Sequence, residues 1–299
     1  SGGIDSSVLL AALAARDQLP RRVFTAYLTG IGAGETAPVL ASARRQATKL
    51  GIEQIEIAYG EDEFWRLLPE IVELLDDPVA DPTVLPIYLL AREAGPSESP
   101  VLLGDGGDEL FAGYGRYRSV VRPWYLGGPK VIHPRGRFDR LDILRRQPAA
   151  WRDGIRAAES LENQTSRSKL QVAQAVDCAD WLPNDVLLRL ERCLGRHGLD
   201  GRFPFLDAAV AEVAFALADD LKVKGGHGKY LLRRWLEKVV PEAEPFAPKQ
   251  RGPSPIMAWM SHHGERLGPL VAAEPGVAEV ARPDRVVALF RKEGRREAF

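Results

Sequence analysis

The stretch SGGIDSS (residues 1–7) runs directly into VLLAALAAR (residues 8–16), and this junction decides the fold. Gly2 and Gly3 have no Cβ, so a ligand can approach the backbone closely and successive N–H groups can point at it. The Ala- and Leu-rich run that follows is typical of a helix, which carries positive partial charge at its N-terminus. Together with the three serine hydroxyls of the stretch, this pattern predicts a phosphate site. The alternative is a glycine-rich loop that only caps the helix.

Asp5 is the unusual member of this predicted phosphate site. Two common phosphate motifs do not fit, because no Lys follows the glycines as in GxxxxGK[ST] and the spacing is not GxGxxG. A carboxylate beside an anion is unfavourable unless a cation bridges the two. The position of Asp5 therefore predicts a metal ion between the chain and the phosphates.

A second glycine-rich acidic turn, GDGGDE (residues 104–109), follows the short apolar run VLL (residues 101–103). In open α/β sheets, ligands bind outside the carboxyl ends of the strands, where both turns would lie. Asp5 and Asp108 are therefore predicted to supply one oxygen each to a Mg²⁺ ion that completes its shell with water and polyphosphate. The alternative is an acidic turn whose carboxylates cap local N–H groups.

The first part of the chain alternates between strand and helix patterns. Strand composition is found at residues 22–28, 52–59 and 101–103, and helical periodicity at residues 8–16, 36–50, 61–75 and 81–90. This alternation predicts an α/β fold with a parallel, doubly wound sheet. Because Ser1 stands in the middle of a strand-to-turn-to-helix unit, we expect a further strand before it in a longer protein.

Beyond about residue 118 the strand patterns fade and helical patterns dominate, at residues 184–194, 208–218 and 229–240. We therefore divide residues 1–299 into an α/β nucleotide-binding part, residues 1–118, and a mainly helical part, residues 119–299, that packs back on the site.

Composition excludes several classes of protein. The chain has 299 residues, of which 45% are hydrophobic, and 40 Lys+Arg balance 41 Asp+Glu to a net charge of −1. Such a chain has no long-range field for nucleic acid or an anionic membrane, and no apolar run of about 18 residues spans a bilayer. Cys178 and Cys193 form neither a disulfide scaffold nor a Cys-rich zinc motif, and we expect both to be structural in a cytoplasmic protein.

SGGIDSS and GDGGDELFAGY (residues 104–114) together resemble the synthetase domain of the asparagine synthase family, which has the ATP pyrophosphatase (PP-loop) fold. SGGxDS alone is shared with GMP and NAD synthetases and tRNA thiolation enzymes, and the second motif narrows the choice. Further segments match in family order and extend the resemblance to about residue 255: DDPVADPTVLPIYLLAREA, WLPNDVLLRLERC, GLDGRFPFLD, GKYLLRRWL and PKQRGPSP.

The resemblance implies a ligase that uses ATP and Mg²⁺. A carboxylate attacks the α-phosphate of ATP to give an acyl-adenylate and pyrophosphate, and an amine then displaces AMP to form an amide. Aspartate and ammonia are the first expected substrates, and a glutaminase domain, absent from this chain and acting in cis or in trans, would supply the ammonia. Homo-oligomers are compatible with this assignment.

The resemblance also implies roles for individual residues. Asp5 and Asp108 would ligate Mg²⁺, and Lys229 would reach the phosphates and the charge that develops at the adenylated centre. Asp105 would lie beside the acyl-adenylate, where it either orients or deprotonates the amine or only forms the turn. The residues expected to contact pyrophosphate or nucleotide are Ser1, Gly2, Gly3, Asp5, Ser6, Ser7, Gly104 and Lys249.

The chain departs from the family pattern in its helical half. It has Glu191, Arg192, Cys193 and Leu194 where the family commonly has an acid and Arg with Met and Ser, and Asp200 where Glu is usual. These departures lie near the acceptor side. They therefore weaken the inference that aspartate is the substrate more than the inference that ATP is. The alternatives are a related amide synthase of the β-lactam or lasso-peptide macrolactam type, and a non-catalytic relative that binds nucleotide or a partner protein.

Overall fold

The computed structural model describes residues 1–30, 33–75, 81–126, 128, 132–133, 136, 138–139, 141–146, 150–163, 166–247 and 255–291. The N-terminal half contains α1 (Ile4–Ala14), β1 (Arg22–Leu28), α2 (Ala33–Leu50), β2 (Glu53–Tyr59), α3 (Glu61–Leu75), α4 (Val84–Ala94), η1 (Pro96–Glu98), β3 (Val101–Leu102), α5 (Gly107–Leu110), α6 (Gly115–Val120) and η2 (Trp124–Leu126). The C-terminal half contains α7 (Asp153–Glu162), α8 (Lys169–Ala179), η3 (Leu182–Leu187), α9 (Leu188–Arg196), β4 (Gly201–Arg202), η4 (Pro204–Leu206), α10 (Ala208–Ala216), α11 (Asp219–Lys222), α12 (Tyr230–Val239), η5 (Pro241–Ala243), α13 (Pro255–His262), α14 (Gly264–Ala273), α15 (Pro275–Val280) and α16 (Pro283–Phe290).

The strands form two separate parallel pairs in the described part of the chain. β1 pairs with β2 from Arg22 opposite Glu53 to Leu28 opposite Tyr59, and β3 pairs with β4. Parallel pairing and a mainly helical second half agree with the α/β prediction. One continuous doubly wound sheet is not confirmed, because β1 and β3 do not pair with each other. The division at residue 118 stays a prediction.

An apolar groove of about 460 Å³ separates the two strand pairs. Its lining comes from β1, β3, α1 and α4, and includes Val23, Phe24, Val101, Leu103, Leu9 and Leu13. Ser1, Ser6 and Gly104 lie among the lining residues. The groove thus runs up to the two glycine-rich turns, and it separates the strand edges that a continuous sheet would join.

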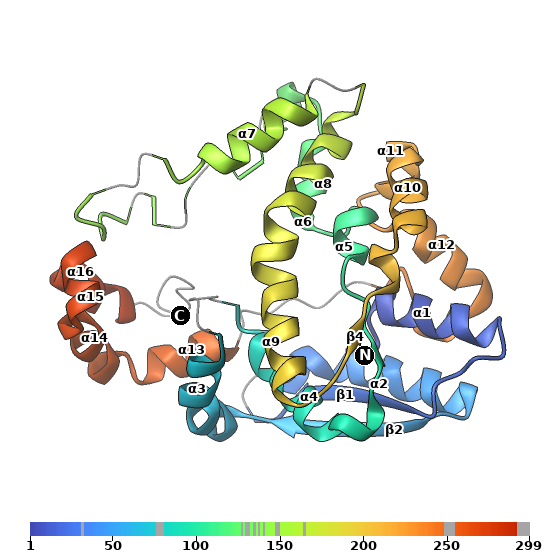
Figure 1. Cartoon of the computed structure of the whole chain (residues 1–299), viewed down its shortest axis with the longest axis horizontal. Helices are drawn as coiled ribbons and strands as arrows, with labels where there is room; N and C mark the ends of the chain where they lie inside the picture. The colour runs from blue at the N-terminus through green and yellow to red at the C-terminus, as the bar shows by residue number, and fades with distance from the viewer. Residues whose placement is uncertain are drawn as a thin grey trace.

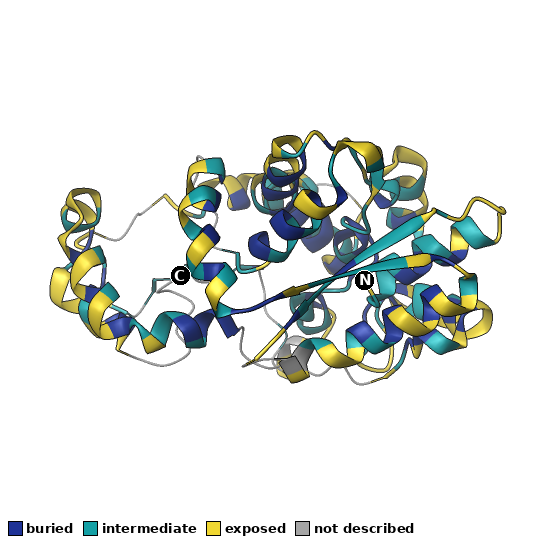
Figure 2. Ribbon diagram, turned by 90° about the horizontal axis from the view of Figure 1, so that it is seen from below, coloured by how far each residue is buried: buried dark blue, intermediate teal, exposed yellow. Residues whose placement is uncertain are grey.

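Several apolar clusters hold the elements in place, and the buried segments of the helices face inward (Figure 2). One cluster joins the ends of β1 and β2 to α3, α4 and α13 through Leu28, Tyr59, Phe64 and Trp259. A second joins α1, α5, α10 and α12. The helices α14 and α16 form a satellite cluster at one side of the molecule (Figure 1). In this arrangement α1, α5 and α12 share one core, which fixes the three elements that carry the predicted site.

No helix in the described ranges is both long enough and apolar enough to cross a membrane.

Candidate active site

The N-terminal turn leaves the start of α1 open. Gly3 is the N-cap of α1 and makes no side-chain cap, so the N–H groups of the first turn have no side-chain partner of that kind. The Ser7 hydroxyl donates to Gly3 O at 2.8 Å, and the side chain is 1% exposed, so it supports the turn from inside. Ser1 Oγ and Ser6 Oγ are 2.7 Å apart at the exposed side. The predicted anion cradle is therefore formed by backbone donors and the two outer serines.

Glycines of the second turn let Asp5 approach closely. A Cβ on Gly107 would lie 2.5 Å from Asp5 Oδ1, and one on Gly104 would lie 2.8 Å from Asp5 Cβ. Any side chain at either position would push the two turns apart. Gly2 in the first turn has a different neighbour, because a Cβ on it would overlap the Val39 carbonyl oxygen of α2. Gly104 and Gly107 thus leave room for Asp5, and Gly2 lets the first turn lie close to α2.

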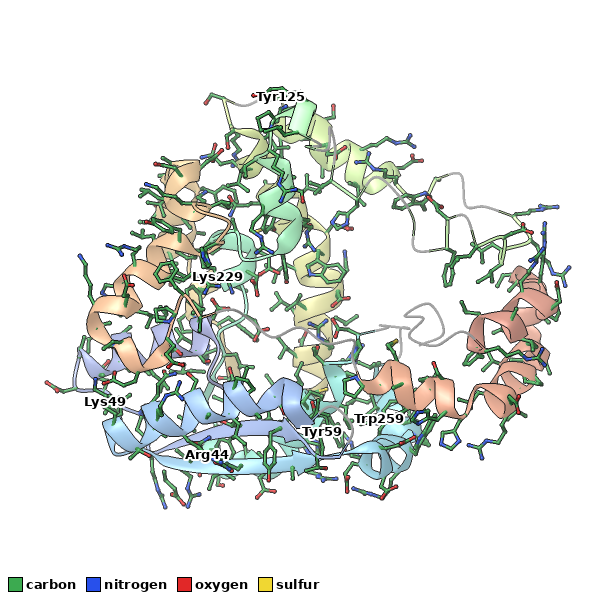
Figure 3. The ribbon with its side chains drawn as sticks, turned by 180° about the vertical axis from the view of Figure 1, so that it is seen from behind. Arg44, Lys49, Tyr59, Tyr125, Lys229 and Trp259 are labelled. Carbon is green, nitrogen blue, oxygen red and sulfur yellow. The ribbon has the colours of Figure 1, made fainter. Side chains whose placement is uncertain are left out.

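Asp5, Asp108 and Lys229, which we call the Asp5 cluster, meet at the junction of α1, α5 and α12. Lys229 Nζ lies 2.8 Å from Asp108 Oδ1 and also pairs with Asp5 Oδ2. The Lys229 side chain is 7% exposed, and it lies inside the molecule, whereas Arg44 and Lys49 point outward from α2 (Figure 3). Residues far apart in the sequence are therefore brought together as the motifs predicted.

The backbone around Lys229 is shaped for this contact. Lys229 adopts a left-handed conformation with φ of 54°, and its N–H donates to Phe111 O at 2.9 Å. Non-glycine residues held in this region usually mark functional sites. A Cβ on Gly113 would overlap Asp108 and Lys229, and one on Gly228 would overlap the Ala112 carbonyl. These glycines were not predicted as site residues, although both lie in motif segments.

The charges of the Asp5 cluster are strongly perturbed. Burial raises the pKa of Asp5 to about 6, with repulsion from Asp108 adding to burial and attraction by Lys229 opposing it. Burial would lower the pKa of Lys229, but attraction by Asp5 and Asp108 outweighs burial and raises it. The single ammonium of Lys229 thus pairs with two carboxylates, so the cluster has a net negative charge when both acids are ionised.

An orphaned oxygen in this cluster fits a divalent cation. Asp5 Oδ1 is buried and has no hydrogen-bond partner in the described structure. Mg²⁺ prefers carboxylate oxygens and is commonly held by one or two of them, with phosphates and water completing the shell. Asp5 and Asp108 match that donor set, and no group of three or more acidic, His or Cys side chains within the described ranges offers a complete protein cage. The residues present therefore fit Mg²⁺ in a shell shared with phosphates.

Asp105 lies next to this cluster and near Arg189. Burial raises the pKa of Asp105, while the charge of Arg189 on α9 opposes the increase. Arg189 is 7% exposed and pairs with Asp185 and, at 3.0 Å, with Asp81. Asp81 Oδ1 also accepts hydrogen bonds from Thr83 N at 2.8 Å and from Thr83 Oγ1 at 2.7 Å, just before the start of α4. Sequence reasoning did not single out Arg189, although this residue lies in the matching segment WLPNDVLLRLERC.

Lys249 lies outside the described residues, so its expected contact with pyrophosphate or nucleotide stays a prediction. Within the described ranges, Arg233 on α12 is the basic residue that follows Lys229 by one helical turn. The Arg233 guanidinium donates to Gly228 O at 2.8 Å and to Pro245 O. Burial lowers the pKa of Arg233, and the negative charges of Asp5 and Asp108 oppose this decrease.

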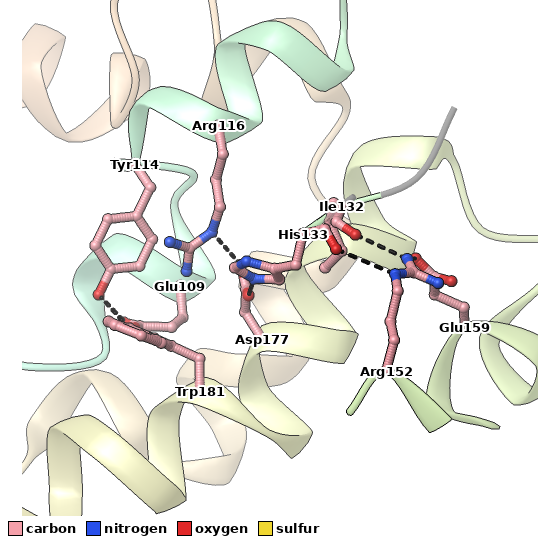
Figure 4. A network of polar contacts seen from close by, with 9 residues as sticks. All are labelled: Glu109, Tyr114, Arg116, Ile132, His133, Arg152, Glu159, Asp177 and Trp181. Carbon is pink, nitrogen blue, oxygen red and sulfur yellow. Dashed lines mark hydrogen bonds and ion pairs between the residues drawn. The ribbon is translucent and has the colours of Figure 1, made fainter. Parts of the chain in front are cut away.

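Asp177, Arg116 and His133, which we call the Asp177 cluster, form a second buried group of charges (Figure 4). Arg116 Nε lies 2.8 Å from Asp177 Oδ2, and His133 Nε2 lies 3.0 Å from Asp177 Oδ1. Burial would raise the pKa of Asp177, but the hydrogen bonds from His133 and Arg116 and the charge of Arg116 outweigh burial and lower it. Sequence analysis did not predict this cluster.

The Asp177 cluster borders the second motif through Tyr114. The Tyr114 hydroxyl donates to Glu109 Oε1 at 2.7 Å, and Arg116 Cζ lies 4.1 Å from the centre of the Tyr114 ring. Glu109 is 1% exposed, and burial raises its pKa. The residue after Asp108 is therefore held inside the protein and does not face the candidate metal site.

Both cysteines are buried or partly buried free thiols, and burial raises the pKa of each to about 12. Thiols with such a pKa are protonated at neutral pH and are poor nucleophiles. This agrees with the structural role predicted for Cys178 and Cys193.

Comparison with known proteins decides the family. The asparagine synthase family model matches residues 1–298. The chain belongs to the asparagine synthase family. The recognition made from the motifs is therefore confirmed, and with it the assignment to an enzyme family of this type.

The curated relatives that this chain matches here are named as asparagine synthetases. It is 30% identical to asparagine synthetase [glutamine-hydrolyzing] 1 of Bacillus subtilis (strain 168), over 88% of this chain and 46% of the relative. It is 33% identical to a putative asparagine synthetase [glutamine-hydrolyzing] of Mycobacterium tuberculosis (strain ATCC 25618 / H37Rv), over 87% of this chain and 45% of the relative. It is 26% identical to the asparagine synthetase [glutamine-hydrolyzing] of Bos taurus, over 84% of this chain and 38% of the relative. The chain thus spans less than half the length of these relatives.

Proposed function

We propose that this chain is the synthetase part of an enzyme that makes an amide from a carboxylate, ATP and an amine through an acyl-adenylate, with AMP and pyrophosphate as products. The observation that carries the proposal is the Asp5 cluster at the open N-terminus of α1. Backbone N–H groups and a buried ammonium can hold phosphates there, and two carboxylates can hold the cation that phosphates bring.

Each residue of the cluster has a proposed part in the first step. When Mg²⁺ is bound, it neutralises charge on the polyphosphate, and Asp5 and Asp108 are the residues that hold it. The first turn of α1, with Ser1 and Ser6, grips the pyrophosphate as the bond between the α- and β-phosphates breaks. Lys229 faces the same space, and its raised pKa keeps it cationic at neutral pH.

Asp105 has a proposed part in the second step. The attacking amine must lose a proton when the carbon–nitrogen bond forms and AMP leaves. Burial raises the pKa of Asp105, which brings the carboxylate closer to the range in which it accepts a proton. Its place between Asp108 and Arg189 suits that exchange, because Arg189 favours the ionised form before the transfer.

Aspartate and ammonia are the proposed substrates, with a glutaminase domain in cis or in trans as the source of ammonia. The named relatives support this choice, since each is called a glutamine-hydrolyzing asparagine synthetase. The departures at Glu191, Cys193 and Asp200 support the other amide synthases as second candidates. A cytoplasmic location stays part of this proposal.

Isotope transfer tests the chemistry and the substrate together. The protein in its natural full length is incubated with Mg²⁺, ATP, ammonia and aspartate whose side-chain carboxylate carries ¹⁸O. Formation of asparagine with one ¹⁸O in the released AMP is the expected result, because the attacking oxygen stays on phosphorus. Release of pyrophosphate with another carboxylate or a peptide, and not with aspartate, would move the protein to a different amide synthase. No release with any carboxylate would contradict the proposal and leave a non-catalytic relative.

A further inference from the structure

Lys222 is a buried cation that the proposed chemistry does not use. It ends α11, its residue is 0% exposed, and it pairs with no carboxylate among the ion pairs of the described residues. Its Nζ donates to Gln174 Oε1 at 3.0 Å and lies 5.6 Å from the centre of the Phe215 ring. Burial of an unpaired ammonium is costly, so its place in the fold calls for a physical reason.

Gln174, on α8, connects this ammonium to α5. It is also 0% exposed, and its Nε2 donates to Glu109 O at 2.6 Å and to Leu110 O at 2.7 Å. These are the last two carbonyls of α5, a helix of four residues that cannot satisfy its own C-terminal acceptors. The amide of Gln174 therefore donates to the two carbonyls that the N–H groups of a further helical turn would otherwise satisfy.

Lys222 and the two carbonyls of α5 together fix which way this amide points. An ammonium can only donate and a backbone carbonyl can only accept, so Gln174 Oε1 must face Lys222 and Nε2 must face α5. The positive charge also lies on the side of the negative end of the α5 dipole. Without the ammonium, the buried Gln174 Oε1 would lose this donor, and the carbonyls of α5 would have to hold the amide without it.

The short segment at residues 222–229 is linked to α5 at both of its ends. Lys222 reaches the last carbonyls of α5 through Gln174, and Lys229 N donates to Phe111 O just past the end of α5. Asp108 on α5 also meets the Lys229 side chain, with Oδ1 2.8 Å from Nζ. The position of α5 is thus held by the same segment that supplies the lysine of the candidate site.

We propose that Lys222 is a positioning residue for the candidate metal and phosphate site: through Gln174 it holds α5 so that Asp108 faces Asp5 and Lys229. This inference rests on the proposed function, since it assigns Lys222 a part in cation and phosphate binding. Lys222 itself touches neither.

The ionisation of Lys222 supports this part. Burial lowers the pKa of Lys222 to about 8, and the charge of Asp219 opposes the decrease. The Asp219 carboxylate itself accepts a hydrogen bond from Ser168 at 2.8 Å. Lys222 is therefore mainly protonated at neutral pH without a salt bridge of its own.

Cation binding by variants tests the inference. Lys222→Met keeps the length of the side chain and removes the charge, and Lys224→Met makes the same change at an exposed position two residues along. Mn²⁺ replaces Mg²⁺, and electron paramagnetic resonance of the free ion gives its affinity for the protein in its natural full length with ATP. Affinity per folded molecule should fall by about tenfold in Lys222→Met and stay unchanged in Lys224→Met.

A second variant, Gln174→Met, keeps the test decisive even if Lys222→Met does not fold. Gln174→Met should weaken Mn²⁺ binding by a similar factor, and the double variant should be no worse than either single one, because both act through the same hydrogen bonds. A purely structural role would lower the melting temperature and leave the affinity of the folded fraction intact, which would overturn the inference. Wild-type protein that binds no Mn²⁺ with ATP would overturn the proposed function and this inference together, whereas equal affinities of wild type and variants would overturn this inference alone.

Discussion

The Asp5 cluster and the Asp177 cluster are both partly buried groups of acids and nitrogen-containing side chains, yet their charges are balanced in opposite ways. Asp177 has two nitrogen partners of its own, and its pKa is lowered. Asp5 shares one lysine with a second carboxylate, leaves Oδ1 without a partner, and has a raised pKa.

The difference separates a structural cluster from a functional one. A buried acid with enough cations and hydrogen bonds is already at its most stable, so it needs no ligand. A buried pair of acids with too little positive charge is stabilised by any cation that enters, and its lysine remains available for another anion. The predictions below test this contrast, beginning with the largest expected effect.

Lys229→Met should abolish most of the catalytic activity of the folded protein, and this substitution leaves the Asp177 cluster unchanged. Loss of the buried cation that faces the phosphates is expected to slow adenylation by about a thousandfold. Pyrophosphate release under single-turnover conditions measures this effect, with Lys224→Met as the matched control. Full activity in Lys229→Met would place Lys229 among structural lysines.

Asp177→Asn should destabilise the fold and spare the chemistry. It leaves Arg116 without its counter-charge in a mostly buried place, and removal of one partner of such a pair costs about 3 kcal/mol. Urea unfolding measures the loss, and activity is compared per folded molecule. A variant that is as stable as the wild type but has lost its activity would reverse the roles we assign to the two clusters.

Mg²⁺ with ATP should stabilise the protein through the Asp5 cluster alone. At a hundred times the dissociation constant, a ligand that binds only the native state adds about 2.7 kcal/mol. Thermal unfolding with and without Mg²⁺ and ATP measures the gain. We expect Asp108→Asn to lose most of it and Asp62→Asn, at an exposed position on α3, to keep it.

The two clusters should also give stability opposite dependences on pH. The raised pKa of Asp5 contributes stability that is fully present below about pH 4 and is lost as pH rises through about 6. The lowered pKa of Asp177 contributes stability that is present above its unfolded value and is lost as pH falls through the folded value.

Unfolding free energies measured between pH 3 and 8 test this contrast. Asp5→Asn should flatten the decline between pH 4 and 7 by about 3 kcal/mol, and Asp177→Asn should flatten the acid side. Slopes equal to those of the wild type in both variants would mean that neither acid carries the pH dependence.

Local patterns predicted the elements that depend on near neighbours. The strand at residues 22–28 and the helix at residues 61–75 have the predicted bounds, because their composition and periodicity agree with their surroundings. The helix expected from Val8 begins at Ile4, since Asp5, Ser6 and Ser7 lie inside its first turn and Gly3 is the cap. An acid in that turn is favoured by the helix dipole.

Elements that depend on distant partners were not predicted. β4 has two residues and exists because it pairs with β3, about a hundred residues earlier in the chain. The π-helix η3 begins at Leu182 and contains Pro183, and its single wide turn has no periodic signal. A continuous sheet was expected from alternation alone, which indicates parallel strands without saying which ones pair.

The candidate site follows the same rule. Glycine spacing and acid placement predicted that Asp5 and Asp108 lie close together, because that information is local. Lys229 was expected near the same site only from the family resemblance of its segment. Gln174 and Lys222 have no such signal, since one is an ordinary helix glutamine and the other is the last residue of the short helix α11. Only their complete burial distinguishes them.

The groove between β1 and β3 has a practical consequence for handling this protein. Each of these strands keeps one edge without a strand partner in the described structure, beside an apolar surface that ends at Ser1. Such an edge is a template for intermolecular strand addition. A strand from a neighbouring molecule can therefore pair with either edge, which favours self-association of the protein. Light scattering measured over a range of protein concentrations would detect this association.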